Sequence, residues 1–240
     1  MQAVTTIGLD IAKSVFQVHG IDAQGSVIVR QQLKRARVLP FFKKLGPCVV
    51  GIEACASSHY WAREITALGH EVKLMPPAYV KPYVKRQKND AKDAEAICEA
   101  VQRPSMRFVP VKTPEQQAAL MLHRTRHLLI RQQTAVINSI RAHMAEFGIV
   151  ANVGRMGVDQ LLKIASDPDD TRIPEIARGC IIALGQQLQL LKAQILDLDR
   201  RIIAWHRSSE TSKRLDALPG VGPALATALV ATVADPKAFR

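Results

Sequence analysis

Apolar and polar positions in the first hundred residues follow two alternating patterns, one typical of strands and one typical of helices. Strands are expected, in chain order, at residues 4–10, 15–21, 26–33, 48–53 and 71–75. Helices are expected at residues 39–45, 58–68 and 91–101. The first three strands follow one another with only short turns between them, so they predict a meander. The whole order predicts a mixed α/β layer.

The pattern becomes almost entirely helical after three prolines, Pro104, Pro110 and Pro114, which mark a boundary. One long helix is expected at 115–147, and a second follows it. Apolar residues in the second helix recur at alternating steps of three and four, the heptad spacing of a helix that buries one seam. These residues are Ile181, Leu184, Leu188, Leu191, Ile195, Leu198, Ile202 and Trp205. Residues 152–171 are rich in Gly, Asp and Pro, so we expect a loop that contains a short helix.

The heptad seam has two explanations. Either the two long helices pack on each other as an antiparallel hairpin, or a coiled coil joins copies of the chain into a homo-oligomer. The sequence does not separate these alternatives. Three domains are predicted from the boundaries: 1–110, 111–210 with the long helices, and 211–240.

The chain is strongly basic, with 33 Lys and Arg against 21 Asp and Glu and a net charge of +12. This excess favours a polyanionic partner, either nucleic acid or an anionic membrane surface. The longest uncharged run, 217–234, contains two prolines and two glycines and does not predict a membrane-spanning helix. No secretory signal pattern begins the chain, and the cysteines have no zinc-site spacing. We expect a cytoplasmic protein with a nucleic-acid partner and no membrane partner.

Acidic residues end two of the predicted strands. Asp10 ends the first strand, and Glu53 ends the fourth. A single acid after a strand is more often a loop or cap residue than a ligand. Two acids at the ends of adjacent strands, however, could face one cleft, so together they indicate a candidate site.

A second pair of acids, Asp90 and Asp93, lies at the start of the helix expected at 91–101. Residues three apart share one helix face. One explanation is capping, in which Asp90 is the N-cap and Asp93 suits the helix dipole. The other is that these carboxylates face the strand acids and hold two Mg²⁺ or Mn²⁺ ions roughly 3.5–4 Å apart, as in phosphodiester chemistry. Hard oxygen ligands favour these ions over zinc.

Basic residues surround the acids. No acid lies between Asp22 and Glu53, and Asp90 is the only acid from residue 73 to 92. One explanation is that the basic residues help to attract nucleic-acid phosphates to metal ions bound by the acids. The simpler explanation is a solvated basic surface that binds no ligand. Tyr79 and Tyr83 lie in this region and either stack on single-stranded bases or pack inside the protein. The residues expected to bind nucleic acid here are Lys85, Arg86, Lys88 and Lys92.

The segment 218–224 reads Leu-Pro-Gly-Val-Gly-Pro-Ala and precedes an alanine-rich helical pattern. Two close glycines in this position are typical of a helix-hairpin-helix, whose backbone N–H groups contact a DNA phosphate at a helix N-terminus. Gly220 and Gly222 are therefore candidate nucleic-acid contacts. An ordinary tight turn between two helices is the alternative.

Four segments, 8–13, 51–63, 88–94 and 218–223, closely resemble the DEDD transposases of insertion-sequence family 110. They occur in the family's order along nearly the whole chain. The resemblance implies an α/β ribonuclease-H-like (RuvC-like) domain, then an all-α coiled-coil region, then a partial helix-hairpin-helix domain.

The resemblance also implies that Asp10, Glu53, Asp90 and Asp93 are catalytic residues that bind divalent metal. In the family these acids act with a serine nucleophile of the C-terminal domain, while a non-coding bridge RNA pairs with target and donor DNA. The serine lies beyond the segment that matches 235–240, so we expect this chain to be a fragment without it. His59, Tyr60 and Trp61 match the family pattern and are expected to make structural or nucleic-acid contacts.

The leading hypothesis is an insertion-sequence transposase. A junction-resolving or ribonuclease-H-type nuclease is a second possibility, since it needs only the four acids and a metal-activated water. A non-catalytic helix-hairpin-helix DNA-binding protein is a third, with the acids serving as caps and core-edge residues. A sugar-kinase-like ATPase ranks last, because Ile11 and Ala12 stand where its phosphate loop would have glycine.

Overall fold

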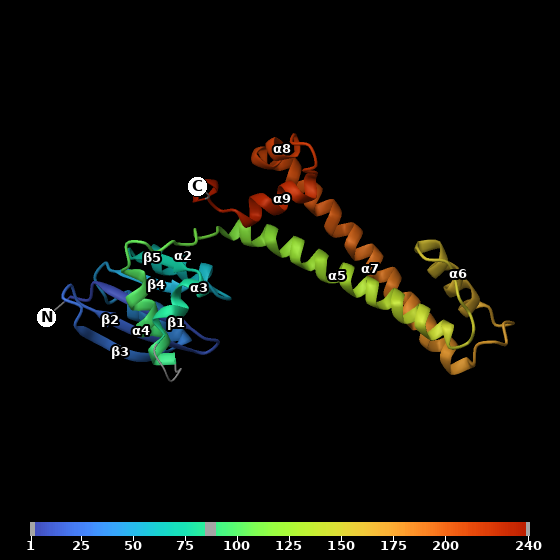
Figure 1. Cartoon of the computed structure of the whole chain (residues 1–240), viewed down its shortest axis with the longest axis horizontal. Helices are drawn as coiled ribbons and strands as arrows, with labels where there is room; N and C mark the ends of the chain where they lie inside the picture. Colours follow the sequence, from blue (N-terminus) through green and yellow to red (C-terminus); the bar gives the residue numbers. More distant parts are fainter. Residues whose placement is uncertain (1–2, 85–89, 239–240) are drawn as a thin grey trace. The chain divides into compact units, whose positions relative to one another are not determined.

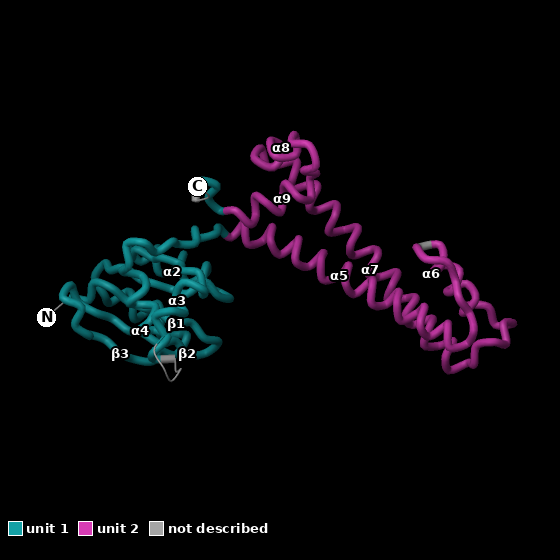
Figure 2. The backbone as a smooth tube through the Cα atoms, viewed as in Figure 1, with its two compact units in different colours: residues 1–113, 234–240 teal, residues 114–233 magenta. Residues whose placement is uncertain are grey.

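The computed structural model of the chain describes residues 3–84 and 90–238, without the side chains of Asp90, Arg155 and Ala238. The chain forms two compact units, coloured separately in Figure 2. One comprises residues 1–113 and 234–240, and the other comprises residues 114–233. The division into three functional domains stays a prediction.

A five-stranded mixed sheet forms the centre of the first unit (Figure 1). Its strands are β1 Thr6–Ile11, β2 Val15–Ile21, β3 Val27–Lys34, β4 Val49–Glu53 and β5 Glu71–Met75. Their order is β3-β2-β1-β4-β5, in which β1 to β3 are antiparallel neighbours and β4 and β5 run parallel to β1. The predicted strands and the meander are confirmed. A mixed sheet with helices is consistent with a ribonuclease-H-like domain.

Helices pack on both faces of this sheet. The helices of the first unit are η1 Arg35–Arg37, α1 Val38–Phe42, α2 Ser58–Ala67, α3 Pro77–Val80, η2 Lys81–Tyr83, α4 Asp90–Val101 and η3 Pro236–Ala238. Successive residues of a strand point to opposite faces. Leu9 belongs to a core cluster with Phe42 of α1 and Trp61 of α2, whereas Gly8 faces α4. The sheet therefore buries one face against α1 and α2 and the other against α4.

Two long antiparallel helices form a hairpin in the second unit (Figure 1). The helices of this unit are α5 Pro114–Ala145, α6 Arg155–Ser166, α7 Glu175–Ser208, α8 Glu210–Asp216 and α9 Pro223–Thr232. The heptad seam of α7 is buried or half-buried, and its Ile181 shares a core cluster with Ile140 of α5. An ion pair between Arg126 and Asp199 also joins α5 to α7. The hairpin alternative is thus observed within one chain, and a homo-oligomer stays a prediction.

Two arginines stabilise the end of the hairpin at which α5 ends and α7 begins. Arg141 of α5 donates a hydrogen bond to the backbone carbonyl of Asn152 at 2.8 Å. The buried Arg178 of α7 donates to the carbonyl of Ala165, near the end of α6, at 2.8 Å. Guanidinium groups satisfy loop carbonyls well because they carry several donors in a fixed geometry. The predicted loop at 152–171 consequently contains a helix of 12 residues, longer than expected.

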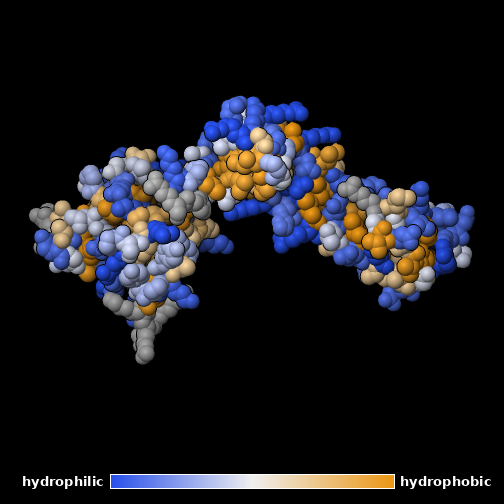
Figure 3. Space-filling model, turned by 45° about the horizontal axis from the view of Figure 1, so that its top comes forward, coloured by the Kyte–Doolittle hydropathy of each residue, from blue (hydrophilic) through white to orange (hydrophobic). Residues whose placement is uncertain are grey.

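The short helices α8 and α9 pack against each other and against the hairpin. The hydroxyl of Thr227 on α9 lies 3.1 Å from Nε2 of His123 on α5. Figure 3 shows apolar surface on this unit, and its exposed apolar residues include Leu218, Leu225 and Leu229. Throughout residues 3–84 and 90–238, every helix is too short or too polar to span a lipid bilayer.

Candidate metal centre

Asp10 and Glu53 lie at the carboxyl ends of two neighbouring parallel strands. In the register of β1 and β4, Gly8 lies opposite Gly51. Each acid follows its glycine by two residues, so it points to the same face of the sheet as that glycine. Both acids are half-buried. The fold therefore brings these two carboxylates to one edge of the sheet, on the face that α4 covers.

The helix α4 lies close to this face because both facing positions are glycines. A Cβ atom on Gly8 would lie 2.1 Å from the carbonyl oxygen of Ala94 and 2.5 Å from the backbone nitrogen of Cys98. A Cβ atom on Gly51 would lie 2.8 Å from Cβ of Val101. No side chain could fit at either position without a shift of the helix. The helical acids are thus carried by an element fixed directly against the strands that carry the other two.

Asp93 is half-buried in the first turn of α4, and its Oδ1 atom is buried with no hydrogen-bond partner in the described part of the chain. Leaving a buried polar atom unsatisfied costs about 1–3 kcal/mol. Ile97 lies one turn further along the same side of α4 and shares a core cluster with Met75, the last residue of β5. Asp93 therefore lies on the side of α4 that faces the carboxyl ends of the parallel strands.

Asp90 is the first residue of α4, but its side chain lies outside the described part of the structure. Among the side chains that are described, no group of three or more His, Cys, Asp or Glu residues could hold a metal ion. The fold brings Asp10, Glu53 and Asp93 into one region without closing a ligand shell. Their role as metal ligands, together with Asp90, stays a prediction.

The thiol of Cys55 lies in the electrostatic field of both strand acids. Burial raises its pKa, and the negative charges of Glu53 and Asp10 raise the pKa further. Cys55 belongs to the loop between β4 and α2, which directly follows Glu53. Ser57 in the same loop has a φ of 69°, a left-handed conformation that is uncommon for residues other than glycine. Such backbone strain is frequent in loops that form active sites.

His59 and Trp61 make structural contacts, whereas Tyr60 is exposed. Nδ1 of His59 accepts a hydrogen bond from the backbone N–H of Lys112 at 3.1 Å, and Arg63 donates to the carbonyl of Lys112 at 2.6 Å. Burial lowers the pKa of His59, and the charges of Lys112 and Arg63 lower it further. Trp61 is only 3% exposed. Local sequence patterns do not predict the Lys112 contact, because its partners lie 49 and 53 residues away in the chain.

Most of the basic residues predicted to contact nucleic acid near α4 cannot be placed. Lys85, Arg86 and Lys88 lie outside the described residues, and Lys92 is half-buried near the start of α4. The outer strand β3 supplies other exposed cations, including Arg30, whose guanidinium lies 3.9 Å from the carboxylate of Glu95. Nucleic-acid binding by these residues stays a prediction.

The turn between α8 and α9 contains both predicted glycines. Gly220 has a φ of 84°, which only glycine adopts without strain. The backbone N–H of Val221 donates to the carbonyl of Leu218 at 3.0 Å and closes the turn. Gly222 directly precedes Pro223, the first residue of α9. The structure thus contains two helices joined by a glycine-bearing turn, and its contact with DNA phosphate stays a prediction.

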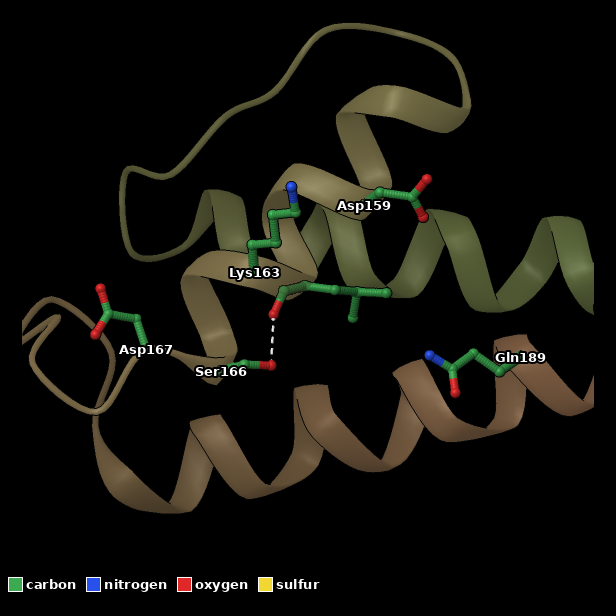
Figure 4. Close-up of a pocket in the computed structure, with 6 residues that line it drawn as sticks. Asp159, Lys163, Ser166, Asp167 and Gln189 are labelled. Atoms are coloured by element: carbon green, nitrogen blue, oxygen red, sulfur yellow. Dashed lines mark hydrogen bonds between the residues drawn. The ribbon is translucent and has the colours of Figure 1, made fainter.

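A hollow of about 420 Å³ lies between α6 and α7 (Figure 4). Its described lining residues are Asp159, Leu162, Lys163, Ser166, Asp167 and Gln189. Nζ of Lys192 lies 3.4 Å from the carboxylate of Asp159, and the hydroxyl of Ser166 donates to the carbonyl of Leu162 at 2.8 Å. The hollow contains none of the predicted site residues.

Comparison with known proteins identifies relatives over the whole chain. The sequence model of the IS110 DEDD transposase family, which carries the description "Transposase", matches residues 7–149 of this chain. A putative transposase of Sinorhizobium fredii is 48% identical over 100% of this chain and 62% of its own length. A probable family 20 transposase of Pseudomonas aeruginosa is 48% identical over 99% of this chain and 70% of its own length.

A more distant relative is the transposase for insertion sequence element IS1328 of Yersinia enterocolitica. It is 37% identical over 100% of this chain and 71% of its own length. The chain thus spans 62% of the Sinorhizobium relative and somewhat more of the other two. The family match covers both glycines and all four acids of the region described above. This chain therefore belongs to the IS110 family of DEDD transposases.

Proposed function

We propose that this chain is the metal-binding part of a transposase that cleaves and rejoins DNA strands during movement of an insertion sequence. The observation that carries the proposal is the buried Oδ1 atom of Asp93, which has no hydrogen-bond partner among the described residues. A capping carboxylate oxygen would accept a backbone N–H, so Oδ1 does not act as a cap. Its place on the side of α4 toward the carboxyl ends of the parallel strands supports an oxygen that would bind a cation together with Asp10 and Glu53.

The proposed ligands are Asp10, Glu53, Asp90 and Asp93. Their donor atoms are all carboxylate oxygens, which favour Mg²⁺ or Mn²⁺. A bound divalent ion would stabilise the negative charge that builds up on a reacting phosphate. The chain's own contribution would be positional: two strand ends and one helix, kept close together by Gly8 and Gly51, would direct the four carboxylates toward the ion.

The proposed macromolecular partners are DNA and, by family resemblance, a structured bridge RNA. The net charge of +12 supports a polyanionic partner. Lys85, Arg86, Lys88 and Lys92 would contact phosphates beside the acids, and the backbone at Gly220 and Gly222 would contact phosphates at the α8–α9 turn. The long helices α5 and α7 would also join copies of the chain into a homo-oligomer.

Titration with Mn²⁺, followed by electron paramagnetic resonance of the free ion, tests the metal centre directly. The chain should bind Mn²⁺, and Asp93→Asn should lower the affinity by at least about tenfold, since even residues that only orient a ligand change metal affinity 10–100-fold. Asp10→Asn and Glu53→Gln should have the same effect.

Glu71→Gln is a matched control, because Glu71 is the first residue of β5 and so lies at the end of the parallel strands opposite to the candidate metal centre. Its carboxylate already pairs with Lys73 at 3.1 Å. This variant should bind Mn²⁺ like the unchanged chain. Undiminished binding by Asp93→Asn would show that the helical acid is not a ligand.

A metal-dependent nuclease remains the second candidate, because the first unit contains all four acids. Such an enzyme would hydrolyse branched DNA with a water nucleophile. Incubation of the chain with a four-way junction and Mn²⁺ separates the two. Hydrolysis that disappears in Glu53→Gln favours the nuclease, whereas no hydrolysis favours a transposase that uses another nucleophile.

A further inference from the structure

A second hollow, about 580 Å³ in volume, opens on the first unit between the segment α3–η2 and the residues that follow α4. Its lining residues include Tyr79, Pro82, Tyr83, Ser105, Met106 and Arg107. The described acids of the candidate metal centre do not line it. Its size falls within the range of small-molecule sites, which is roughly 300–1,000 Å³. The hollow is therefore a separate candidate binding site.

Two tyrosine rings give the hollow its aromatic surface. Tyr79 is 46% exposed, so its ring is accessible to a ligand. Tyr83 is half-buried, and the guanidinium carbon of Arg103 lies 5.6 Å from its ring centroid. Arg103 is itself held by Glu99 at 2.6 Å. One tyrosine is thus fixed by neighbouring charges, and the other presents a ring to solvent.

The rim of the hollow is cationic. Arg107 is exposed, as is Lys81, which lies next to the lining residue Pro82. Nζ of Lys73 lies 5.2 Å from the ring centroid of Phe108, the residue after Arg107. The described lining residues are all neutral or positively charged. A strand of nucleic acid passing the hollow would bring its phosphates to these cations.

We propose that this hollow binds an unstacked base of a single-stranded nucleic acid. The base lies against the ring of Tyr79, and the neighbouring phosphate binds Arg107. Met106 and Pro82 supply an apolar surface under the base, and the hydroxyl of Ser105 can pair with its polar edge. Aromatic rings beside a basic groove are the combination that single-strand-binding proteins use. A duplex offers no such ligand, because its bases are stacked inside.

This proposal rests on the proposed function in one respect, that the protein handles nucleic acid. It is tested with the full chain and an oligonucleotide of about 12 nucleotides, within the site sizes of single-strand-binding proteins. One base is 2-aminopurine, whose fluorescence changes with stacking. DNA and RNA versions are measured in parallel to determine which strand the hollow prefers, and a duplex of the same sequence serves as reference.

Tyr79→Ala should weaken single-strand binding by about tenfold, because base–aromatic stacking contributes about 1–3 kcal/mol per base. Tyr79→Phe keeps the ring and should bind within about twofold of the unchanged chain. Arg107→Gln should weaken binding and reduce its salt dependence by about one phosphate contact. Thermal unfolding of each variant checks that the fold is retained, and the exposed position of both side chains makes that outcome expected.

Equal single-strand affinities for Tyr79→Ala and the unchanged chain would overturn the proposal and leave DNA binding elsewhere on the protein intact. An equal loss of duplex and single-strand binding would also overturn it, since that pattern indicates a general change in charge or fold. Mn²⁺ binding is measured without nucleic acid, so failure of the hollow and failure of the metal centre give different results. A chain that binds no single strand of either kind contradicts the proposal outright.

Discussion

Gly8 of β1 lies directly opposite Gly51 of β4, and both present bare backbone to α4. Because neither residue has a side chain, the backbone of α4 can lie close to the backbone of both strands. The acids that follow each glycine by two residues are thereby placed under the same helix that carries Asp90 and Asp93. The geometry of the candidate metal centre thus depends on two residues that have no side chain.

Gly8→Ala should destabilise the first unit by about 1–3 kcal/mol, the usual cost of overpacking a core. The added Cβ would lie 2.1 Å from the carbonyl oxygen of Ala94, so the α4 backbone must move. Urea unfolding followed by circular dichroism measures the change. Gly46→Ala is the control, because a Cβ there has no neighbour within 4 Å, and it should unfold close to the unchanged chain.

Asp93→Asn should destabilise the chain by no more than about 1 kcal/mol without divalent metal, because Oδ1 has no hydrogen-bond partner to lose among the described residues and only the helix-dipole contribution is removed. With Mn²⁺ at a hundredfold excess over its dissociation constant, binding should stabilise the unchanged chain by about 2.7 kcal/mol. The variant should gain much less. Thermal unfolding with and without Mn²⁺ measures both effects, and an equal gain in the two proteins would exclude Asp93 as a ligand.

The free energy of unfolding of the second unit should fall as the pH drops below about 6.5, in part because His123 takes up a proton. Burial lowers the pKa of His123 from 6.5, and the charge of Arg126 lowers it further. The unfolded chain then binds a proton more readily than the folded chain. The stabilisation is complete above pH 6.5 and is lost as the pH falls through the lower folded pKa.

Thermal unfolding between pH 5 and pH 8 checks this dependence. His123→Gln removes the titrating group but keeps a side chain that can pair with Thr227, so its curve should be flatter at acid pH. His59 has a lowered pKa in the first unit and contributes with the same sign. An identical pH dependence in His123→Gln and the unchanged chain would contradict the assignment.

Gly220→Ala should destabilise the α8–α9 turn by about 1–2 kcal/mol, since the left-handed conformation is costly for other L-residues. A Cβ at Gly220 has open space around it, so its φ of 84° is the only obstacle. Gly222→Ala is the matched comparison, because Gly222 has an extended backbone with a φ of −80°. Its stability should be nearly unchanged. If its backbone approaches a phosphate, Gly222→Ala should still weaken duplex DNA binding in a filter-binding assay.

The strands and the long helices could be predicted because each has a periodicity that sequence alone displays. The short α3 and η2, of 4 and 3 residues, are too brief to show one. The length of α6 was also missed, since Gly, Asp and Pro in that region are typical of loops. Tertiary contacts from Arg141 and Arg178 stabilise the region, and these partners are distant in sequence.

Strand ends, helix spacing and family resemblance together indicate the four candidate acids. The placement of Asp10 and Glu53 at the same end of the sheet follows from the parallel register of β1 and β4, which the pattern of a single strand does not specify. The need for Gly8 and Gly51 became visible only with α4 in place. Likewise, the heptad pattern is the same for an intrachain hairpin and for a coiled coil between copies, so only the packing of α5 on α7 shows the hairpin.

The exposed cations of β3 have one more consequence. β3 is the outermost strand of the sheet, and it exposes Arg30 and Lys34. An outermost strand directs backbone N–H and C=O groups outward, where the strand of another molecule can pair with them. If the β3 strands of two copies paired in this way, their positively charged side chains would lie close together and repel each other. The positive charge proposed to bind DNA would therefore also hinder edge-to-edge aggregation, and added salt should weaken both effects.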